Sequence, residues 1–220
     1  MNQLINQLFG NWNIKAVIFD LDGTMINNNA FHLASWRQYL QELGITITEE
    51  EYRLNINGRT NKDAIEYIYQ RKMSDEEAMV YTLEKESLYR KLYLPHIKPV
   101  AGLLQLLSLI AEKNLPIGIA TSGIPVNIDF FFEHVPVRQY FSAIVHSAHI
   151  THGKPHPEIF LKTAAALNRL PEECLVFEDA AVGVKAAQSA GMKVIALTTT
   201  QTTEELKEAD RIIPDFTHLF

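Results

Sequence analysis

The chain has 220 residues, 47% of them hydrophobic and 21% charged, which fits a globular protein with one large domain or a domain with a small insert. A formal net charge of −6, with no cluster of Lys and Arg, disfavours nucleic acid as the main ligand, because a phosphate backbone needs a basic surface. The single cysteine, Cys174, excludes an intrachain disulfide, and no signal-peptide pattern or bilayer-length apolar stretch is visible, so we expect a cytoplasmic protein with neither a membrane nor an obligate protein partner.

Short apolar runs alternate with helical patterns along most of the chain. The runs are Ile14–Phe19, Leu115–Ala120, Ala143–Val145, Leu175–Phe177 and Val194–Leu197. Near-continuous apolar segments of this length are typical of parallel strands that are buried on both faces. The helical patterns between them are Leu103 with Leu107 and Ile110, then Ile159–Leu167, then Ala180–Ala190 ended by Gly191. This alternation predicts an α/β fold with a doubly wound, Rossmann-like parallel sheet.

One segment near the N-terminus interrupts the alternation, because from about Asn29 to Leu94 it has only helical patterns. Apolar residues recur there at three- and four-residue steps, at Leu33, Trp36, Leu40 and Leu43. Two capping-box starts follow, at Thr48 with Glu51 and at Ser74 with Glu77. We therefore expect a small α-helical domain at 29–95, inserted into an α/β core made of 1–28 and 96–220.

Two carboxylates lie two residues apart directly after the first predicted strand, in Asp20-Leu21-Asp22-Gly23-Thr24. Ligands of doubly wound sheets bind at the carboxyl ends of strands. There Asp20 could attack phosphorus as a nucleophile, and Asp22 could act as general acid and base. By itself the motif could equally be an Asp-Gly turn. An EF-hand calcium loop is excluded, because Met25 occupies the position where it needs a glycine.

The sequence FDLDGT after an apolar strand resembles the first motif of the haloacid dehalogenase-like superfamily, and the other motifs follow in order between about Ile14 and Pro214. The second motif is matched by Thr121, with Ser122 beside it, and the resemblance implies that these hydroxyl groups bind the transferred phosphoryl group. The third motif is matched by Lys154, whose ammonium group would neutralise charge on the phosphate and on Asp20.

The fourth motif is matched by Glu178-Asp179, which again follow an apolar strand. With Asp20 and the main-chain carbonyl of Asp22, they resemble the Mg²⁺ site of the superfamily. Acidic residues at the start of a helix are also expected without a metal. A second metal hypothesis is zinc at His146, His149, His152 and His156. Gly153, Pro155 and Pro157 prevent one continuous helix there, so we interpret most of these histidines as loop residues.

The helical segment resembles the cap of the β-phosphoglucomutase-like subfamily, which closes over the site. The residues expected to contact substrate are His32, Trp36, Asn57, Gly58, Arg59 and Lys62. His32 matches a histidine thought to assist the acid/base aspartate, although a surface histidine on a helix would look the same. Where the subfamily's mutase has a lysine and an arginine, this chain has Asn57 and Asn61. A Lys and an Asn expected after the second motif are also replaced, by Ile124-Pro125.

These departures favour a phosphatase over a phosphomutase, because they remove the groups that would hold a second phosphate. The first hypothesis is therefore a Mg²⁺-dependent phosphohydrolase that acts on a small phosphorylated metabolite, such as a sugar phosphate. The alternatives are a sugar phosphomutase and a catalytically silent binding protein. The silent protein is disfavoured because Asp20, Asp22, Thr121, Lys154 and Asp179 are all present.

Overall fold

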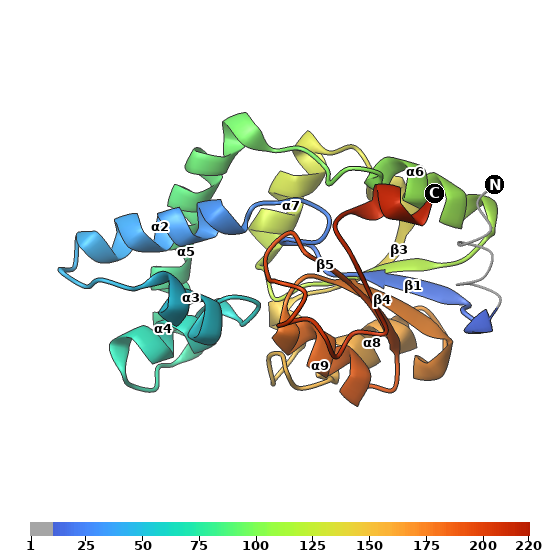
Figure 1. Ribbon diagram of the computed structural model, residues 1–220. Coiled ribbons are helices and arrows are strands. Elements are labelled where there is room, and N and C mark those ends of the chain that lie inside the picture. The colour runs from blue at the N-terminus through green and yellow to red at the C-terminus, as the bar shows by residue number, and fades with distance from the viewer. Residues whose placement is uncertain (1–10) are drawn as a thin grey trace.

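A six-stranded parallel sheet forms the centre of the computed structural model, which describes residues 11–220 (Figure 1). The strands are β1 (Ala16–Phe19), β2 (Ile117–Ala120), β3 (Phe141–Val145), β4 (Cys174–Glu178), β5 (Lys193–Leu197) and β6 (Arg211–Ile213). Their order is β3-β2-β1-β4-β5-β6, and each neighbouring pair is parallel. The predicted fold class and the five predicted strands are confirmed. Strand β6 was not predicted, because three residues are too few for a recognisable pattern.

Helices cover both faces of this sheet (Figure 1). One face packs against α6 (Leu103–Glu112) and α7 (Pro125–His134), and the other against α8 (Glu158–Ala166) and α9 (Ala181–Ser189). Side chains of β1 alternate between the two cores: Val17 and Phe19 join the first, Ala16 and Ile18 the second. Because both faces are buried, the four inner strands contain only two polar residues, at the end of β4 and at the start of β5, which is why their sequence signal is clear.

Four helices that follow β1 form a group of their own, which we call the helical insert (residues 29–95). They are α2 (Asn29–Gln41), α3 (Glu49–Asn55), α4 (Asn61–Tyr69) and α5 (Asp75–Tyr93). An apolar cluster that includes Trp36, Leu40, Tyr52 and Ile65 holds them together. In Figure 1 these helices lie to one side of the sheet, opposite the carboxyl end of β1. The division into two domains remains a prediction.

Of the two capping boxes predicted in the insert, one forms completely and the other only in part. At α3 the complete capping box forms: Thr48 Oγ1 accepts a hydrogen bond from the backbone N–H of Glu51, whose carboxylate accepts from Thr48 N–H. At α5, Ser74 Oγ accepts from the N–H of Glu77, but the carboxylate of Glu77 pairs with Arg71. The prediction of a second capping box is therefore wrong in one respect: the Glu77 carboxylate does not accept a hydrogen bond from the backbone N–H of Ser74, because it pairs with the guanidinium group of Arg71.

Short 3₁₀ helices occupy several of the connections. They are η1 (Leu94–His96), η2 (Arg138–Tyr140), η3 (Ser147–His149), η4 (Pro171–Glu173) and η5 (Phe216–Leu219). Among residues 11–220, no helix is both long enough and apolar enough to cross a membrane.

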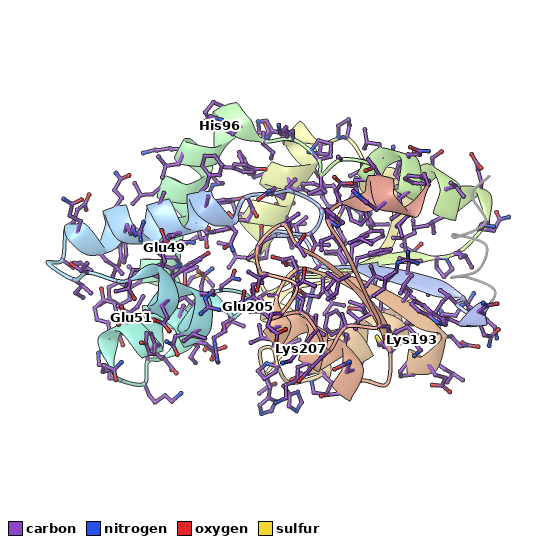
Figure 2. The ribbon with its side chains drawn as sticks, viewed as in Figure 1. Glu49, Glu51, His96, Lys193, Glu205 and Lys207 are labelled. Carbon is purple, nitrogen blue, oxygen red and sulfur yellow. The ribbon has the colours of Figure 1, made fainter. Side chains whose placement is uncertain are left out.

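Contacts at Gly58 and Arg53 join the helical insert to the carboxyl side of the sheet. Ser122 Oγ donates a hydrogen bond to the carbonyl of Gly58 at 3.1 Å. Gly58 has a φ of +75°, and a Cβ atom there would lie 2.8 Å from Val182 Cγ2, so glycine permits the approach. Arg53 of α3 forms an ion pair with Glu205, which Figure 2 shows on the side of the 200–210 segment that faces α3. The insert is thus held closely against the carboxyl edge of the sheet.

Candidate active site

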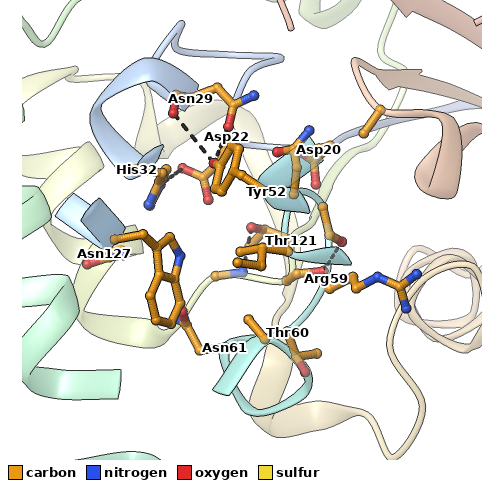
Figure 3. Close-up of a pocket in the computed structure, with 18 of the residues that line it drawn as sticks. Asp20, Asp22, Asn29, His32, Tyr52, Arg59, Thr60, Asn61, Thr121 and Asn127 are labelled. Atoms are coloured by element: carbon orange, nitrogen blue, oxygen red, sulfur yellow. Dashed lines mark hydrogen bonds and ion pairs between the residues drawn. The ribbon is translucent and has the colours of Figure 1, made fainter. Parts of the chain in front are cut away.

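The site residues lie where neighbouring parallel strands end. Asp20 follows β1, Thr121 follows β2, and Glu178 with Asp179 closes β4. Since β1 is hydrogen-bonded to both β2 and β4, these ends meet at one edge of the sheet. A pocket opens there between the sheet and the helical insert (Figure 3). Ligand sites of open α/β sheets lie at this position.

Lys154 connects two of these strand ends. Its Nζ lies 2.6 Å from Asp20 Oδ1 and 2.5 Å from Glu178 Oε1, and the ammonium group is almost completely buried. Burial alone would lower the pKa of Lys154, but the two carboxylates outweigh it and the pKa is raised. Lys154 therefore stays positive. Burial raises the pKa of Asp20 well above its ordinary value, with Lys154 opposing that change.

Glu178 is held in place by hydrogen bonds to both of its oxygens. Oε1 accepts from Lys154, while Oε2 accepts from the backbone N–H groups of Asp179 and Ala180 at 2.8 and 2.9 Å. A Cβ atom on Gly183 of α9 would lie 1.8 Å from Glu178 Oε1, so only glycine leaves room for the carboxylate. Glu178 thereby holds the ammonium group of Lys154 in place, and its predicted role as a metal ligand stays a prediction.

Asp179 and Asp20 are better placed to bind a cation. Asp179 is buried and accepts a hydrogen bond on Oδ1 from Thr24 Oγ1 at 3.2 Å. Burial, followed by the Glu178 carboxylate, raises the pKa of Asp179 to about 8. Its Oδ2 lies against Gly23, where a Cβ atom would come within 2.0 Å. Asp20, Glu178 and Asp179 are three buried carboxylates, and Lys154 is the one ammonium group that pairs with them among the described residues. Such an excess of buried carboxylate oxygens is the donor set expected of a Mg²⁺ site. The predicted carbonyl ligand of Asp22 stays a prediction.

Asp22 faces the pocket with a side chain that is 27% exposed. Asn28 Nδ2 donates to Asp22 Oδ1 at 2.5 Å, and Asn28 Oδ1 accepts from Gly23 N–H at 2.9 Å, which fixes the turn. His32 Nε2 lies 3.6 Å from Asp22 Oδ1, and its ring stacks on Tyr89 with centroids 3.8 Å apart. Asp22 is therefore held by an amide, with an imidazole within reach. Figure 3 shows His32 beside Asp22 at the edge of the pocket.

Most of the predicted substrate residues line this pocket. Thr121 and Ser122 line it from the sheet, and His32, Trp36, Asn57, Gly58 and Arg59 from the insert. Two buried donors, Asn57 Nδ2 and Arg59 Nε, have no hydrogen-bond partner among the described residues, as expected of groups that await a ligand. Lys62 does not line this pocket, because its ammonium group pairs with Asp75 at 2.5 Å.

Seven further polar residues line the pocket and were not predicted as substrate contacts: Asn29, Tyr52, Thr60, Asn61, Lys85, Glu86 and Asn127. Lys85 Nζ lies 2.8 Å from His32 Nδ1 and 2.9 Å from Glu86 Oε1. The side chains of Lys85 and Glu86 are only 1% and 2% exposed. In the sequence, Lys85-Glu86 looks like an exposed charged pair on a helix. Only the packing of α5 against α2 and α4 turns these residues inward.

The histidines of the zinc hypothesis are not on one helix, as the sequence indicated: His146 precedes η3 and His149 ends it, while His152 and His156 lie in the loop before α8. His152, His156 and Glu158 have potential ligand atoms within 4.8 Å of one another on the surface. Glu158 is already bound by Lys162 at 2.6 Å. These residues lie outside the pocket.

The carboxylates of Asp20, Asp22 and Asp179 and the buried ammonium group of Lys154 thus meet at one strand edge, across the pocket from the helical insert. These features define an α/β enzyme that handles an anionic substrate. A family model described as haloacid dehalogenase-like hydrolase matches residues 17–197, and the chain belongs to that family.

Named relatives cover nearly the whole chain. The chain is 29% identical over 212 residues to validoxylamine A 7'-phosphate phosphatase of Streptomyces hygroscopicus subsp. limoneus, covering 93% of this chain and 95% of that protein. It is 28% identical to the fructose-1-phosphate phosphatase of Escherichia coli over 182 residues, covering 82% and 94%. The crystal structure of β-phosphoglucomutase from Clostridium difficile superposes with a TM-score of 0.84 at 28% identity, covering 94% and 93%. The family predicted from the motifs is confirmed.

Proposed function

We propose that this protein is a Mg²⁺-dependent phosphatase that hydrolyses a small phosphorylated metabolite, a sugar phosphate, through a phosphorylated aspartate at Asp20. The observation that carries the proposal is the convergence of Asp20, Asp22, Thr121, Lys154 and Asp179 at one edge of the sheet. The names of the two phosphatase relatives favour a phosphorylated carbohydrate or a similar molecule as substrate.

In the first step an oxygen of Asp20 forms a bond to phosphorus while the bond from phosphorus to the leaving oxygen breaks. Asp22 gives a proton to that oxygen, so the leaving group departs as an alcohol. In the second step Asp22 takes a proton from water as the water oxygen attacks phosphorus. The bond to Asp20 then breaks, and inorganic phosphate is released.

The other residues bind and orient the phosphate. Lys154, held between Asp20 and Glu178, neutralises charge near the attacking oxygen. Thr121 lies at the end of β2 with its hydroxyl group accepting from Gly123 N–H at 3.0 Å, which leaves its own proton for a phosphate oxygen. Asp20 and Asp179 fit a Mg²⁺ ion, which when bound supplies positive charge to the phosphate oxygens.

The helical insert closes the pocket opposite the strand edge. Its contacts through Gly58 and Arg53 hold it against the sheet. Asn57 and Arg59 offer unpartnered donors on this side. We therefore assign substrate binding to the insert and the bond-breaking steps to the sheet.

A sugar phosphomutase is the second candidate, because the β-phosphoglucomutase structure is so similar over the whole chain. A mutase must hold a second phosphate with cationic groups. Lys62 is bound to Asp75 outside the pocket, and Lys85 is bound to Glu86, so Arg59 is the cation that could serve among the described residues lining the pocket. This favours hydrolysis.

The test is phosphate release from a panel of sugar, polyol and alkyl monophosphates, with and without Mg²⁺. We expect turnover of at least one sugar phosphate, and loss of all turnover in Asp20→Asn, because an amide is a poor nucleophile. Folding of that variant is checked by its melting temperature. Turnover in Asp20→Asn near that of the wild type would disprove the mechanism. Rapid isomerisation of β-glucose 1-phosphate primed with the bisphosphate, with little phosphate release, would instead make the protein a mutase.

A further inference from the structure

A group of three polar residues lines the pocket on the side of the insert: the buried Glu86 of α5 and Asn127 of α7, and the half-buried Asn61 at the start of α4. We propose that these residues form a subsite that binds hydroxyl groups of a polyhydroxylated monophosphate, such as a sugar or polyol phosphate. This inference rests on the proposed function and specifies its substrate. Figure 3 shows Asn61 and Asn127 on the side of the pocket away from Asp20.

Glu86 is a charged group in a buried position, with a side chain that is 2% exposed. Such a carboxylate is costly unless it is paired and hydrogen-bonded. Oε1 accepts from Lys85 Nζ and from Asn61 Nδ2, both at 2.9 Å, so its lone pairs are in use. Oε2 accepts from Asn127 Nδ2 at 2.7 Å. Oε2 therefore retains one lone pair for a donor that enters the pocket.

The two amides have fixed orientations. Arg90 Nη1 donates to Asn127 Oδ1 at 2.8 Å, so the amide nitrogen of Asn127 must point to Glu86. That nitrogen has a second proton to donate. Asn61 also gives its nitrogen to Glu86, which leaves Asn61 Oδ1 as an acceptor. The subsite thus offers acceptors at Glu86 and Asn61 beside a donor at Asn127.

A hydroxyl group matches this set because it donates and accepts at the same time. It can donate to Glu86 Oε2 while it accepts from Asn127 Nδ2. A phosphate or carboxylate of the substrate only accepts, and it would place negative charge against Glu86. A bare hydrocarbon chain would leave these buried groups without their hydrogen bonds. The nearby ammonium group of Lys85 offsets the charge of Glu86, so a neutral partner suffices.

The experiment measures binding in the Asp20→Asn protein, which does not turn the ligand over. Calorimetry compares glucitol 6-phosphate with hexyl phosphate, which has the same carbon chain and no hydroxyl groups. We expect the hydroxylated ligand to bind at least about tenfold more tightly, since hydrogen bonds to a charged group are worth this much. Glu86→Gln in that background should reduce the preference about tenfold, because the new amide proton opposes the N–H of Asn127.

Two more variants keep the test decisive. Asn61→Ala removes a half-buried side chain, and it should reduce the preference about threefold. Lys62→Ala is the matched control. Lys62 is next to Asn61 in the sequence, but its side chain points to Asp75, so its removal should leave the preference unchanged. An unchanged preference in Asn61→Ala and in folded Glu86→Gln would overturn the subsite. If no monophosphate is hydrolysed by the wild type, the proposed function fails, while the binding comparison still decides this inference.

Discussion

Replacement of Lys154 by methionine tests the arrangement on which the site depends. The side chain has similar length, but it leaves Asp20 and Glu178 without the ammonium group that lies within 2.6 Å of both. All three side chains are more than nine-tenths buried. Removing one member of a buried ion pair costs about 3–5 kcal/mol, because the remaining charge is uncompensated. For a chain of this length, the melting temperature should fall by about 6–20 °C.

The loss should also depend on pH. Without Lys154, the pKa of Asp20, already raised by burial, rises further. A carboxylate with a raised folded-state pKa favours folding at low pH and loses that contribution as pH rises. Lys154→Met should therefore be closest to the wild type near pH 5 and furthest from it near pH 8. Mg²⁺ should recover part of the difference by supplying positive charge.

The assay is urea unfolding followed by tryptophan fluorescence at both pH values, with and without Mg²⁺. Lys162→Met is the control, because its ion pair with Glu158 is exposed and its loss should leave stability near that of the wild type. A Lys154→Met protein within about 1 kcal/mol of the wild type at pH 8 would refute the reasoning. Turnover should be lost in Lys154→Met whatever its stability.

Three further results are expected. A chelator should abolish phosphate release and Mg²⁺ should restore it, whereas Ca²⁺ should restore little because its looser coordination suits in-line attack poorly; activity after thorough chelation would contradict this. The pKa of Glu86 is lowered to about 2, because Lys85, His32 and Asn127 together outweigh the effect of its burial. About 3 kcal/mol of the free energy of unfolding should therefore be lost as pH falls from 4.5 to 2. Urea titrations of Glu86→Gln should lack this pH dependence. Gly183→Ala should destabilise the fold by about 1–3 kcal/mol and lower kcat, because the new methyl group displaces Glu178; equal stability in denaturation curves would count against the close contact.

The sheet and the residues at its strand ends could be predicted because their signals are local. Strand β1 is an uninterrupted apolar run, and Asp20 follows it at once, so the position of the carboxylate is fixed by the end of the strand. The same holds for Thr121 after β2 and Asp179 after β4. A parallel strand that is buried on both faces is apolar at almost every position, so it appears in the sequence as a nearly continuous apolar run that is easy to recognise.

The insert side of the pocket could not be predicted in the same way. Lys85 and Glu86 lie in α5 among charged residues that do face solvent, and the helical period alone does not say which stripe is covered. Their burial depends on how α5 packs against α2 and α4, which is a tertiary property. Lys62 shows the opposite error: it is close in sequence to Gly58, but the turn of α4 directs it to Asp75. Helix α7 was not predicted either, although Pro125 stands at its start.

The place of β1 in the sheet has a consequence for synthesis of the protein. Of the six strands in this sheet, the first to leave the ribosome is β1, one of the two central strands, and its two neighbours begin at Ile117 and Cys174. Until those residues are made, an entirely apolar strand has both edges unpaired, a condition that favours association with other chains. The helical insert has its own apolar cluster and can form early, but β1 must wait for most of the chain. Protection of β1 during translation is therefore a requirement that follows directly from the strand order.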